Sequence, residues 1–233
     1  MSRRERFLEE MGLSPVWRLR ERPAEAREAE APGITGIGEP EDRDARIARM
    51  EWDELKDAVA QCSACALCKS RKNTVFGVGS ESADWMIIGE APGAEEDERG
   101  EPFVGQAGRL LDSMLAAIGL SRSGEANVYI ANVLKCRPPG NRNPEPSEVG
   151  QCNGYLMRQI QLVQPKIILA MGRFAAQTLL NSDASIASLR GRRLQCRGVS
   201  TVVTYHPAYL LRSLPDKAKA WEDLCFARRE AAA

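Results

Sequence analysis

The sequence predicts an α/β fold: a three-layer α/β/α sandwich with a short, mainly parallel central sheet. Two observations support this prediction: short apolar runs recur along the chain, and stretches with helical spacing of apolar residues separate them. Strands that alternate with helices form parallel sheets covered on both faces. Ligands of such sheets bind beyond the carboxyl ends of the strands, so functional residues are expected directly after each strand.

The expected elements begin with a helix from Trp52 to Cys62, which places Leu55 and Val59 on one face. A buried strand follows at 85–88, and Gly119 ends the next helix. In that helix the apolar residues Leu110, Leu111, Met114, Leu115 and Ile118 fall at helical spacing. The remaining elements are strand 128–131, helix 147–163, strand 167–170, helix 173–180 and strand 201–204.

Composition limits the class of protein. The chain has 233 residues, of which 43% are hydrophobic and 27% are charged, as in ordinary soluble globular proteins. Collagen-like, mucin-like and wholly disordered classes are thereby excluded. No apolar run approaches the ~18 residues of a membrane span, and the charged start of the chain lacks the apolar stretch of a secretory signal. We expect a cytoplasmic protein whose cysteines are ligands or core residues rather than disulfides.

The first 50 residues differ in composition from the rest. They hold 21 of the 64 charged side chains, and a mixed-charge, alanine-containing stretch at 21–30 precedes glycines and prolines at 32–40. This pattern is typical of a frayed helix followed by a linker. We expect residues 1–50 to be a flexible extension and residues 51–230 to form the domain that carries the function.

Chemically distinct groups follow three of the expected strands. Glu90 lies at the end of strand 85–88, in a Gly-Glu-Ala-Pro-Gly loop whose small residues let the backbone approach a ligand. This loop lacks the Gly-Lys-Ser/Thr of a phosphate-binding loop. Asn132 follows the second strand, and His206, the one histidine of the chain, follows the last. A carboxylate, an amide and an imidazole at one rim indicate a pocket.

Four of the seven cysteines have the spacing of metal ligands. Cys62 and Cys65 form a C-x2-C pair, Cys136 follows a strand, and Cys152 lies on the inward face of a helix. Four thiolates fit either zinc or an iron-sulphur cluster, and spacing does not separate the two. A site with two histidine ligands is excluded. The other cysteines, Cys68, Cys196 and Cys225, are interpreted as free thiols.

The formal net charge is zero, so no global positive field attracts nucleic acid, and any such site must be local. Basic residues do gather near the proposed ligands, which indicates a local phosphate-binding surface; a solvated loop is the alternative. These residues are Lys69, Arg71, Lys72, Lys135, Arg137 and Arg142.

Four motifs, in the same order along residues 51–228, resemble those of the family 4 uracil-DNA glycosylases. The resemblance implies an α/β/α sandwich and a DNA repair enzyme that removes uracil from DNA. It also implies a [4Fe-4S] cluster on Cys62, Cys65, Cys136 and Cys152, which favours the cluster over zinc. The motifs are Gly-Glu-Ala-Pro-Gly at 89–93, Pro-Phe-Val-Gly-Gln-Ala-Gly at 102–108, Asn132 with Lys-Cys-Arg-Pro-Pro at 135–139, and His-Pro-Ala-Tyr-Leu-Leu-Arg at 206–212.

The resemblance further implies roles for single residues. Uracil must be flipped out of the helix to be reached. Phe103 would stack on it, and the Asn132 amide would accept from uracil N3–H and donate to O4, a pattern that cytosine inverts. Glu90 would orient water toward the sugar, and His206 would donate to the developing charge on O2. Ala91 and Gly93 complete the expected uracil site.

The expected partner is uracil-containing DNA, single- or double-stranded, bound by a monomeric enzyme that needs no membrane. Leu210 or Leu211 is expected to act as an apolar wedge in the vacated stack. Phosphate contacts are expected from Lys135, Arg137, Arg142 and Arg212.

Two other classes of protein share the cysteines. One is an iron-sulphur redox or electron-transfer protein that binds nucleic acid without cutting it, and the other is a zinc-stabilised binding module. Neither class requires Asn132 or His206, so these two residues separate an enzyme from a binding protein.

Overall fold

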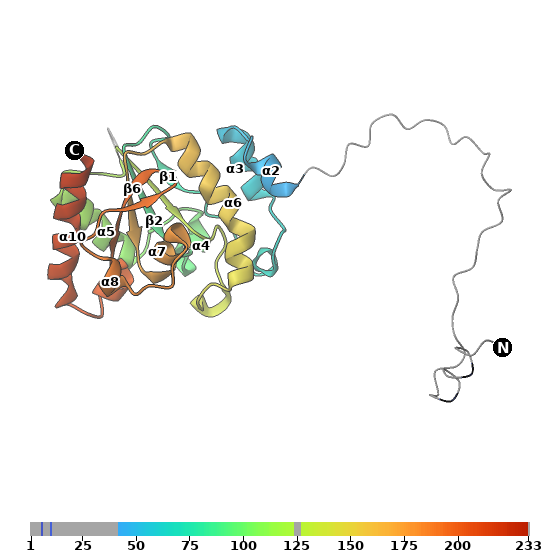
Figure 1. Ribbon diagram of the computed structural model, residues 1–233. Helices are drawn as coiled ribbons and strands as arrows, with labels where there is room; N and C mark the ends of the chain where they lie inside the picture. Colours follow the sequence, from blue (N-terminus) through green and yellow to red (C-terminus); the bar gives the residue numbers. More distant parts are fainter. Residues whose placement is uncertain (1–5, 7–9, 11–41, 124–126, 233) are drawn as a thin grey trace. The chain divides into compact units, whose positions relative to one another are not determined.

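The computed structural model describes residues 6, 10, 42–123 and 127–232 (Figure 1). The chain divides into two units, and the elements below belong to the second, Glu41–Ala233. This unit includes part of the expected extension, because helix α2 (Arg43–Ile47) buries Ile47 in a cluster with Leu55 and Val59. Apart from Arg6 and Glu10, residues 1–41 lie outside the described residues, so the flexible extension remains a prediction.

Six strands form one sheet in the order β1-β3-β2-β4-β6-β5. The four central strands are parallel, and the edge strands β1 and β5 are antiparallel to their neighbours. All four predicted strands are present, whereas the two edge strands were not predicted. The bounds are β1 (Val78–Gly79), β2 (Trp85–Gly89), β3 (Val128–Asn132), β4 (Ile167–Met171), β5 (Leu194–Cys196) and β6 (Val199–Thr204).

The four predicted helices are also present, within a few residues of their expected ends. They are α3 (Trp52–Ala60), α5 (Gln106–Ala117), α6 (Pro146–Val163) and α7 (Arg173–Leu180). Helices that the sequence analysis did not predict are α2, α4 (Ala94–Arg99), α8 (Ile186–Leu189), α9 (Pro207–Leu210) and α10 (Asp216–Ala231), with short 3-10 turns η2 (Ala66–Lys69) and η3 (Pro139–Asn141). No helix within the described residues is both long and apolar enough to cross a membrane.

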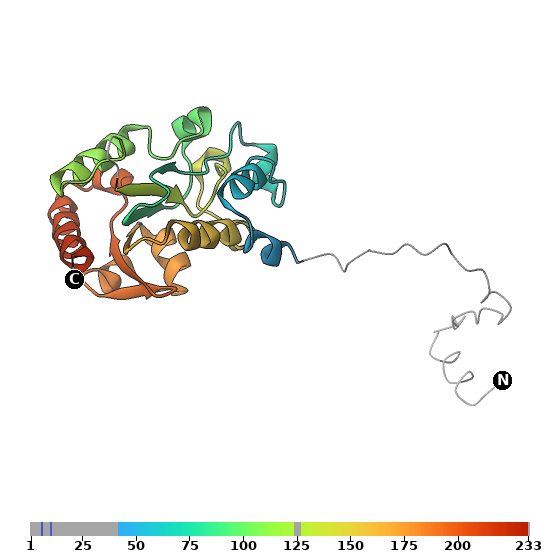
Figure 2. The ribbon, with the colours of Figure 1, turned by 90° about the horizontal axis from the view of Figure 1, so that it is seen from above.

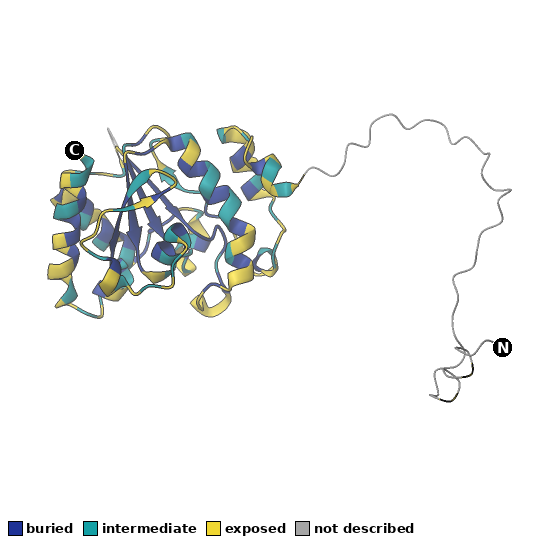
Figure 3. Cartoon of the chain, in the orientation of Figure 1, coloured by how far each residue is buried: buried dark blue, intermediate teal, exposed yellow. Residues whose placement is uncertain are grey.

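The sheet separates two hydrophobic cores, because successive strand residues point to opposite faces. Met86 and Ile88 of β2 pack with α6 and α7, whereas Trp85 and Ile87 pack with α5 and α10. Figure 2 shows these helix pairs on the two sides of the sheet, and strands β2, β3 and β4 are buried along their whole length (Figure 3). The predicted three-layer sandwich with a mainly parallel sheet is confirmed.

The register of the parallel strands sets the position of the polar residues that follow them. Gly89 at the end of β2 is paired with Asn132 at the end of β3. Beyond this pair the backbone N–H of Leu134 still donates to the carbonyl of Glu90, at 3.0 Å. Glu90 and Asn132 therefore lie at the same edge of the sheet. His206 follows β6 by two residues and reaches this edge as well.

Candidate active site

A cavity of about 700 Å³ lies at the carboxyl ends of the parallel strands. It is bounded by the loop after β2, the loop before α5, the end of β3, the start of α7 and the segment after β6. All six residues that the sequence analysis assigned to catalysis or to the uracil line it: Glu90, Ala91, Gly93, Phe103, Asn132 and His206.

The Asn132 side chain is a buried amide that lines this cavity. Asn132 is only 2% exposed, and within the described part of the chain its Oδ1 atom has no hydrogen-bond partner. A buried polar atom without a partner costs about 1 to 3 kcal/mol, so such an atom at a cavity points to a ligand donor. Gly89 makes the space, because a Cβ there would lie 2.4 Å from Asn132 Oδ1 and 2.6 Å from Phe103 Cζ.

Phe103 and His206 form the wall beside Asn132. Their rings are stacked with centroids 5.4 Å apart and planes inclined by 28°. Phe103 adopts a positive φ of 55°, which is unusual for a residue other than glycine and is typical of functional loops. Gly108 permits this conformation, since a Cβ there would lie 1.8 Å from the Phe103 carbonyl oxygen. The second glycine of the 102–108 motif thus leaves space for the backbone conformation that Phe103 adopts.

The His206 imidazole is neutral at physiological pH. Burial lowers its pKa to about 4; the Glu96 carboxylate opposes that fall and the Arg212 guanidinium adds to it. Its Nδ1 atom accepts a hydrogen bond from the Ala208 N–H at 3.2 Å, so the ring proton resides on Nε2. His206 can therefore donate one hydrogen bond into the cavity without carrying a charge.

Glu90 contributes a half-buried carboxyl group. Burial raises the pKa of this carboxyl above its usual value, and the neighbouring Arg173 guanidinium opposes the rise. Arg173 is the first residue of α7 and also lines the cavity. A carboxylate balanced between burial and a cation is suited to hold a water molecule or to face a developing positive charge.

Glu96 is a cavity residue that the sequence analysis missed. Its carboxylate accepts hydrogen bonds from the backbone N–H groups of Gly93 at 3.0 Å, Val104 at 3.0 Å and Gly105 at 3.3 Å. Glu96 thereby ties the loop after β2 to the loop that carries Phe103. Its position three residues after Gly93, within the first turn of α4, is a helix-start signal that the sequence does contain.

Two of the expected DNA contacts line the rim of the cavity. Arg142 is exposed and is held by Glu148, whose carboxylate accepts two hydrogen bonds from its guanidinium, at 2.9 and 2.6 Å. Arg212 is also exposed. Arg137 is half-buried outside the cavity lining, where its Nε donates to Asn141 at 2.8 Å.

Lys135 and Leu210 do not have the accessibility that the sequence analysis expected. Lys135 is 1% exposed, and its ammonium group donates to the Asn132 carbonyl at 2.8 Å and to Gln159 at 2.6 Å. A cluster of basic residues in the sequence does not show which of them point into the protein, and the Lys135 side chain points inward near the end of β3. Leu210 is 1% exposed beside α5 and α10, so of the two expected wedge residues only the half-buried Leu211 remains accessible.

A second, much smaller cavity, of about 10 Å³, brings together the cysteines of the predicted ligand set. Cys62, Cys65, Cys136 and Cys152 all line it, and so does Cys68, which was interpreted as a free thiol outside the set. Within residues 42–123 and 127–232, no group of three or more Cys, His, Asp or Glu side chains is arranged to hold a metal ion.

Arg71 donates hydrogen bonds to two of the cysteines that line this cavity. Its Nη1 atom donates to Cys136 Sγ at 3.0 Å, and its Nη2 atom donates to the carbonyl of Cys62 at 2.7 Å. Burial raises the pKa of the Cys136 thiol to about 11, and Arg71 acts in the opposite direction. A guanidinium against a buried sulphur atom stabilises that sulphur as a thiolate, the form in which cysteine binds metal.

Comparison with known proteins agrees with this geometry. The family model of the Uracil DNA glycosylase superfamily matches residues 76–225. A Type-4 uracil-DNA glycosylase from Archaeoglobus fulgidus is 45% identical over 167 residues, which cover 68% of this chain and 82% of the relative. The enzyme of the same name from Saccharolobus solfataricus is 43% identical over 180 residues, which cover 73% and 82%.

A Type-5 uracil-DNA glycosylase from Pyrobaculum aerophilum is more distant, at 27% identity over 189 residues, which cover 68% of this chain and 83% of the relative. The two Type-4 enzymes are more similar to this chain than the Type-5 enzyme is, which agrees with the resemblance of the motifs to family 4. The chain therefore belongs to the uracil-DNA glycosylase superfamily and, within it, to the type-4 family.

Proposed function

We propose that the chain is a DNA repair glycosylase that takes a flipped uracil into the 700 Å³ cavity and hydrolyses its N-glycosidic bond, leaving an abasic site. One observation carries the proposal: the buried Oδ1 atom of Asn132, beside the wall formed by Phe103 and His206, has no hydrogen-bond partner within residues 42–123 and 127–232. Relatives named uracil-DNA glycosylases support the same activity. An electron carrier or a zinc-stabilised module would have no use for this arrangement.

Uracil recognition follows from the chemistry of the amide. Asn132 Oδ1 accepts from uracil N3–H, and its amino group donates to O4, while the Phe103 ring stacks on the base. Cytosine has an acceptor at N3 and a donor at N4, so it would leave both groups of the amide unpaired inside the protein. At about 1 to 3 kcal/mol for each unpaired group, this difference is enough to reject cytosine.

Bond cleavage separates a base that gains negative charge from a sugar that gains positive charge. The Nε2–H of His206 donates to the uracil O2 atom, because Nδ1 is occupied as an acceptor and the proton of the neutral ring is therefore on Nε2. Glu90 orients a water molecule toward the sugar and opposes its positive charge. Glu96 acts as a positioning residue, because it fixes the loops that carry Glu90 and Phe103.

The proposed DNA contacts are the accessible members of the expected set. Arg142 and Arg212 line the cavity and are suited to phosphates, and Arg137 lies on the same loop as Arg142, five residues before it. Leu211 is the proposed wedge. The proposed substrate is uracil-containing DNA, the proposed state is a monomer, and the proposed place of action is the cytoplasm, where the seven free cysteines remain reduced.

The proposed cofactor is a [4Fe-4S] cluster held by Cys62, Cys65, Cys136 and Cys152. Their convergence on one cavity supports a group with thiolate ligands, and the cluster is the group that the resemblance of the motifs implies. When bound, the cluster would cross-link the segment before β1 to the β3–α6 region. Arg71 would hold Cys136 and Cys62 in place for it.

The activity is tested with purified protein and end-labelled oligonucleotides that contain one uracil, hypoxanthine or thymine. Alkali-sensitive scission at uracil and its absence at thymine are expected, whereas absence of scission at uracil would reject the glycosylase. Scission at hypoxanthine, or its absence, shows whether the enzyme also removes this second deaminated base. The visible absorbance and the iron content of the same preparation test the cluster separately.

A further inference from the structure

The active-site cavity is larger than one pyrimidine requires. Its volume of about 700 Å³ falls in the range of sites for whole drug-sized ligands, roughly 300 to 1,000 Å³. Asn132, Phe103, His206, Glu90 and the loop after β2 account for the uracil. Other lining residues have no role in that site, and among them are Tyr205, Tyr209 and Phe174.

Two of these residues form an aromatic pair. The rings of Tyr205 and Tyr209 are stacked with centroids 5.2 Å apart and planes inclined by 22°. Tyr205 is half-buried, whereas Tyr209 is 39% exposed, a large value for an aromatic side chain. Tyr205 covers one face of the Tyr209 ring, so the exposed surface of that ring is available to a ligand in the cavity.

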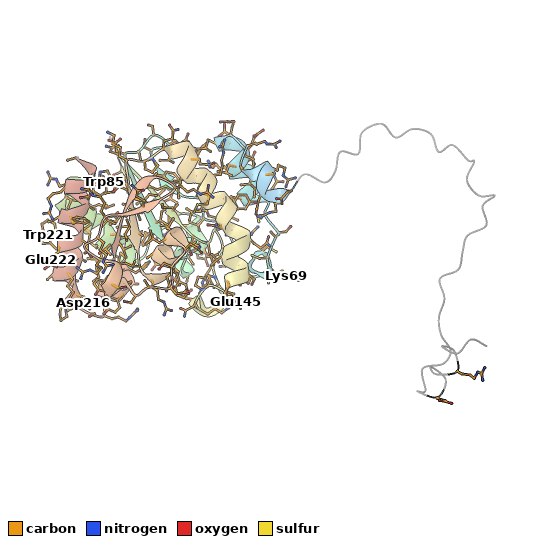
Figure 4. All side chains as sticks on the ribbon, viewed as in Figure 1. Lys69, Trp85, Glu145, Asp216, Trp221 and Glu222 are labelled. Carbon is orange, nitrogen blue, oxygen red and sulfur yellow. The ribbon has the colours of Figure 1, made fainter. Side chains whose placement is uncertain are left out.

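The pair is held rigidly. The Tyr209 hydroxyl donates to Asp216 at 2.6 Å, and the same carboxylate accepts from Ser213 at 2.8 Å and pairs with Lys219 at 2.8 Å. Asp216, which is labelled in Figure 4, is the first residue of α10. An aromatic side chain fixed in this way loses little conformational entropy when a ligand stacks on it.

The other ring of the pair is fixed from its own side. The guanidinium of Arg190 lies over Tyr205, 5.1 Å from the ring centroid, and Arg190 is bound to Asp223 at 2.7 Å. Tyr205 and His206 are consecutive residues in extended backbone after β6, so their side chains point in different directions. One segment thus supplies the uracil wall through His206 and the tyrosine pair through Tyr205.

Cations accompany the exposed ring. Arg212, three residues after Tyr209, is exposed and lines the same cavity, as does Arg173. Aromatic faces beside a positively charged surface are the common means of binding single-stranded nucleic acid, because every base can stack and every linkage carries a phosphate. The combination of Tyr209 and Arg212 therefore suits one nucleotide.

We propose that Tyr209 is the stacking platform for the base next to the uracil, with Arg212 at the phosphate between the two nucleotides. This inference rests on the proposed function and extends it to the choice of strand. A base within a duplex is already paired and stacked on its neighbours, whereas the same base in a single strand is free to stack on Tyr209. Single-stranded uracil DNA is accordingly the preferred substrate.

The test is a double-mutant cycle in which one change is made in the protein and the other in the DNA. Binding to a single-stranded oligonucleotide that contains an uncleavable 2′-fluoro analogue of deoxyuridine is compared with binding to oligonucleotides of the same kind in which the base on one side of the uracil is replaced by a tetrahydrofuran abasic analogue. Wild-type protein and Tyr209→Ala are each measured. Base-aromatic stacking contributes about 1 to 3 kcal/mol, so removing the base on the contacted side should weaken wild-type binding about 5- to 150-fold.

In Tyr209→Ala the same removal should cost little further affinity, because the partner of the base is already gone. Tyr209→Phe, which keeps the ring, should recover most of the affinity that alanine loses. Trp221→Ala removes another exposed aromatic side chain, on α10 outside the cavity, and should bind as wild type (Figure 4).

The inference would be overturned if removing the neighbouring base lowered the DNA affinity of wild type and of Tyr209→Ala by the same factor. It would also be overturned if Tyr209→Ala lowered the affinity for single- and double-stranded substrates equally. A fall in the single-turnover rate at saturating DNA with unchanged affinity would also overturn it, since this would indicate a displaced His206. Failure of the proposed function is distinguishable, because wild-type protein would then release no uracil from any substrate.

Discussion

Gly89 and Asn132 are paired across β2 and β3, and the missing side chain of Gly89 leaves room for the Asn132 amide oxygen, which has no hydrogen-bond partner among the described residues. A Cβ on Gly89 would come within 2.4 Å of that oxygen. The parallel register therefore places a buried hydrogen-bond acceptor on a residue that lines the cavity.

Asn132→Asp should lower single-turnover uracil excision by about 5- to 150-fold, the equivalent of one lost buried hydrogen bond at about 1 to 3 kcal/mol. The carboxylate still accepts from uracil N3–H but no longer donates to O4. Asn181→Asp, at the exposed end of α7, is the matched control and should retain the wild-type rate. Unchanged excision by Asn132→Asp would remove the proposed role of the amide.

The imidazole of His206 should titrate with a midpoint of about 4, well below the ordinary histidine value. The chain has one histidine, so its NMR signals are assigned without mutation. Nitrogen-15 shifts should place the proton on Nε2 at pH 7, because Nδ1 accepts from the Ala208 N–H. A midpoint near 6.5, or a proton on Nδ1, would contradict the neutral-donor mechanism.

The same shift predicts how stability depends on pH. The unfolded chain protonates His206 below about pH 6.5, whereas the folded chain does so only below about pH 4. Between these values the unfolded state binds more protons, so the contribution of His206 to the free energy of unfolding rises with pH across this window. Comparing the pH dependence of unfolding for wild type and His206→Gln isolates this contribution.

Glu90→Gln should lower the single-turnover rate by about 100-fold or more, which is typical of losing a general base. Binding of uracil-containing DNA should change little, since glutamine keeps the shape of the side chain. Glu101→Gln, an exposed residue on the loop before Phe103, is the control for charge. A loss of DNA affinity in Glu90→Gln as large as the loss of rate would indicate a damaged fold.

Arg71→Gln should weaken retention of the proposed cluster, because it removes the donor to Cys136 Sγ and the link to the Cys62 carbonyl. Loss of such a supporting contact typically costs about 10- to 100-fold in metal affinity. Iron retained against increasing chelator measures the effect, and Lys69→Gln controls for a nearby positive charge. If both variants retain iron as wild type does, Arg71 has no such role.

The sequence predicted the central sheet because strands such as Ile167–Met171 are continuous apolar runs between amphipathic helices. It did not predict β1, which has two residues, or β5, which has three, since so few residues show no periodicity. Helix α10 was missed for another reason: charged residues are spread around much of its surface, which leaves only a weak apolar face.

Sequence reasoning expected Glu90, Asn132 and His206 at the ends of the strands, and the backbone topology does bring these three residues to one cavity. The sequence was less informative where the direction of a side chain decides whether it is accessible to DNA. Lys135 and Leu210 turn inward, and their residue types alone favour phosphate and DNA contact. The ties made by Glu96 and the stacking of Tyr205 on Tyr209 depend on tertiary packing that no local pattern records.

The most direct test of the central claim is a crystal structure of the protein with free uracil. The predicted result is a uracil ring against Phe103, with N3 within hydrogen-bond distance of Asn132 Oδ1 and O2 facing His206 Nε2. Uracil bound away from the Asn132 amide, or bound there with neither of these contacts, would contradict the account.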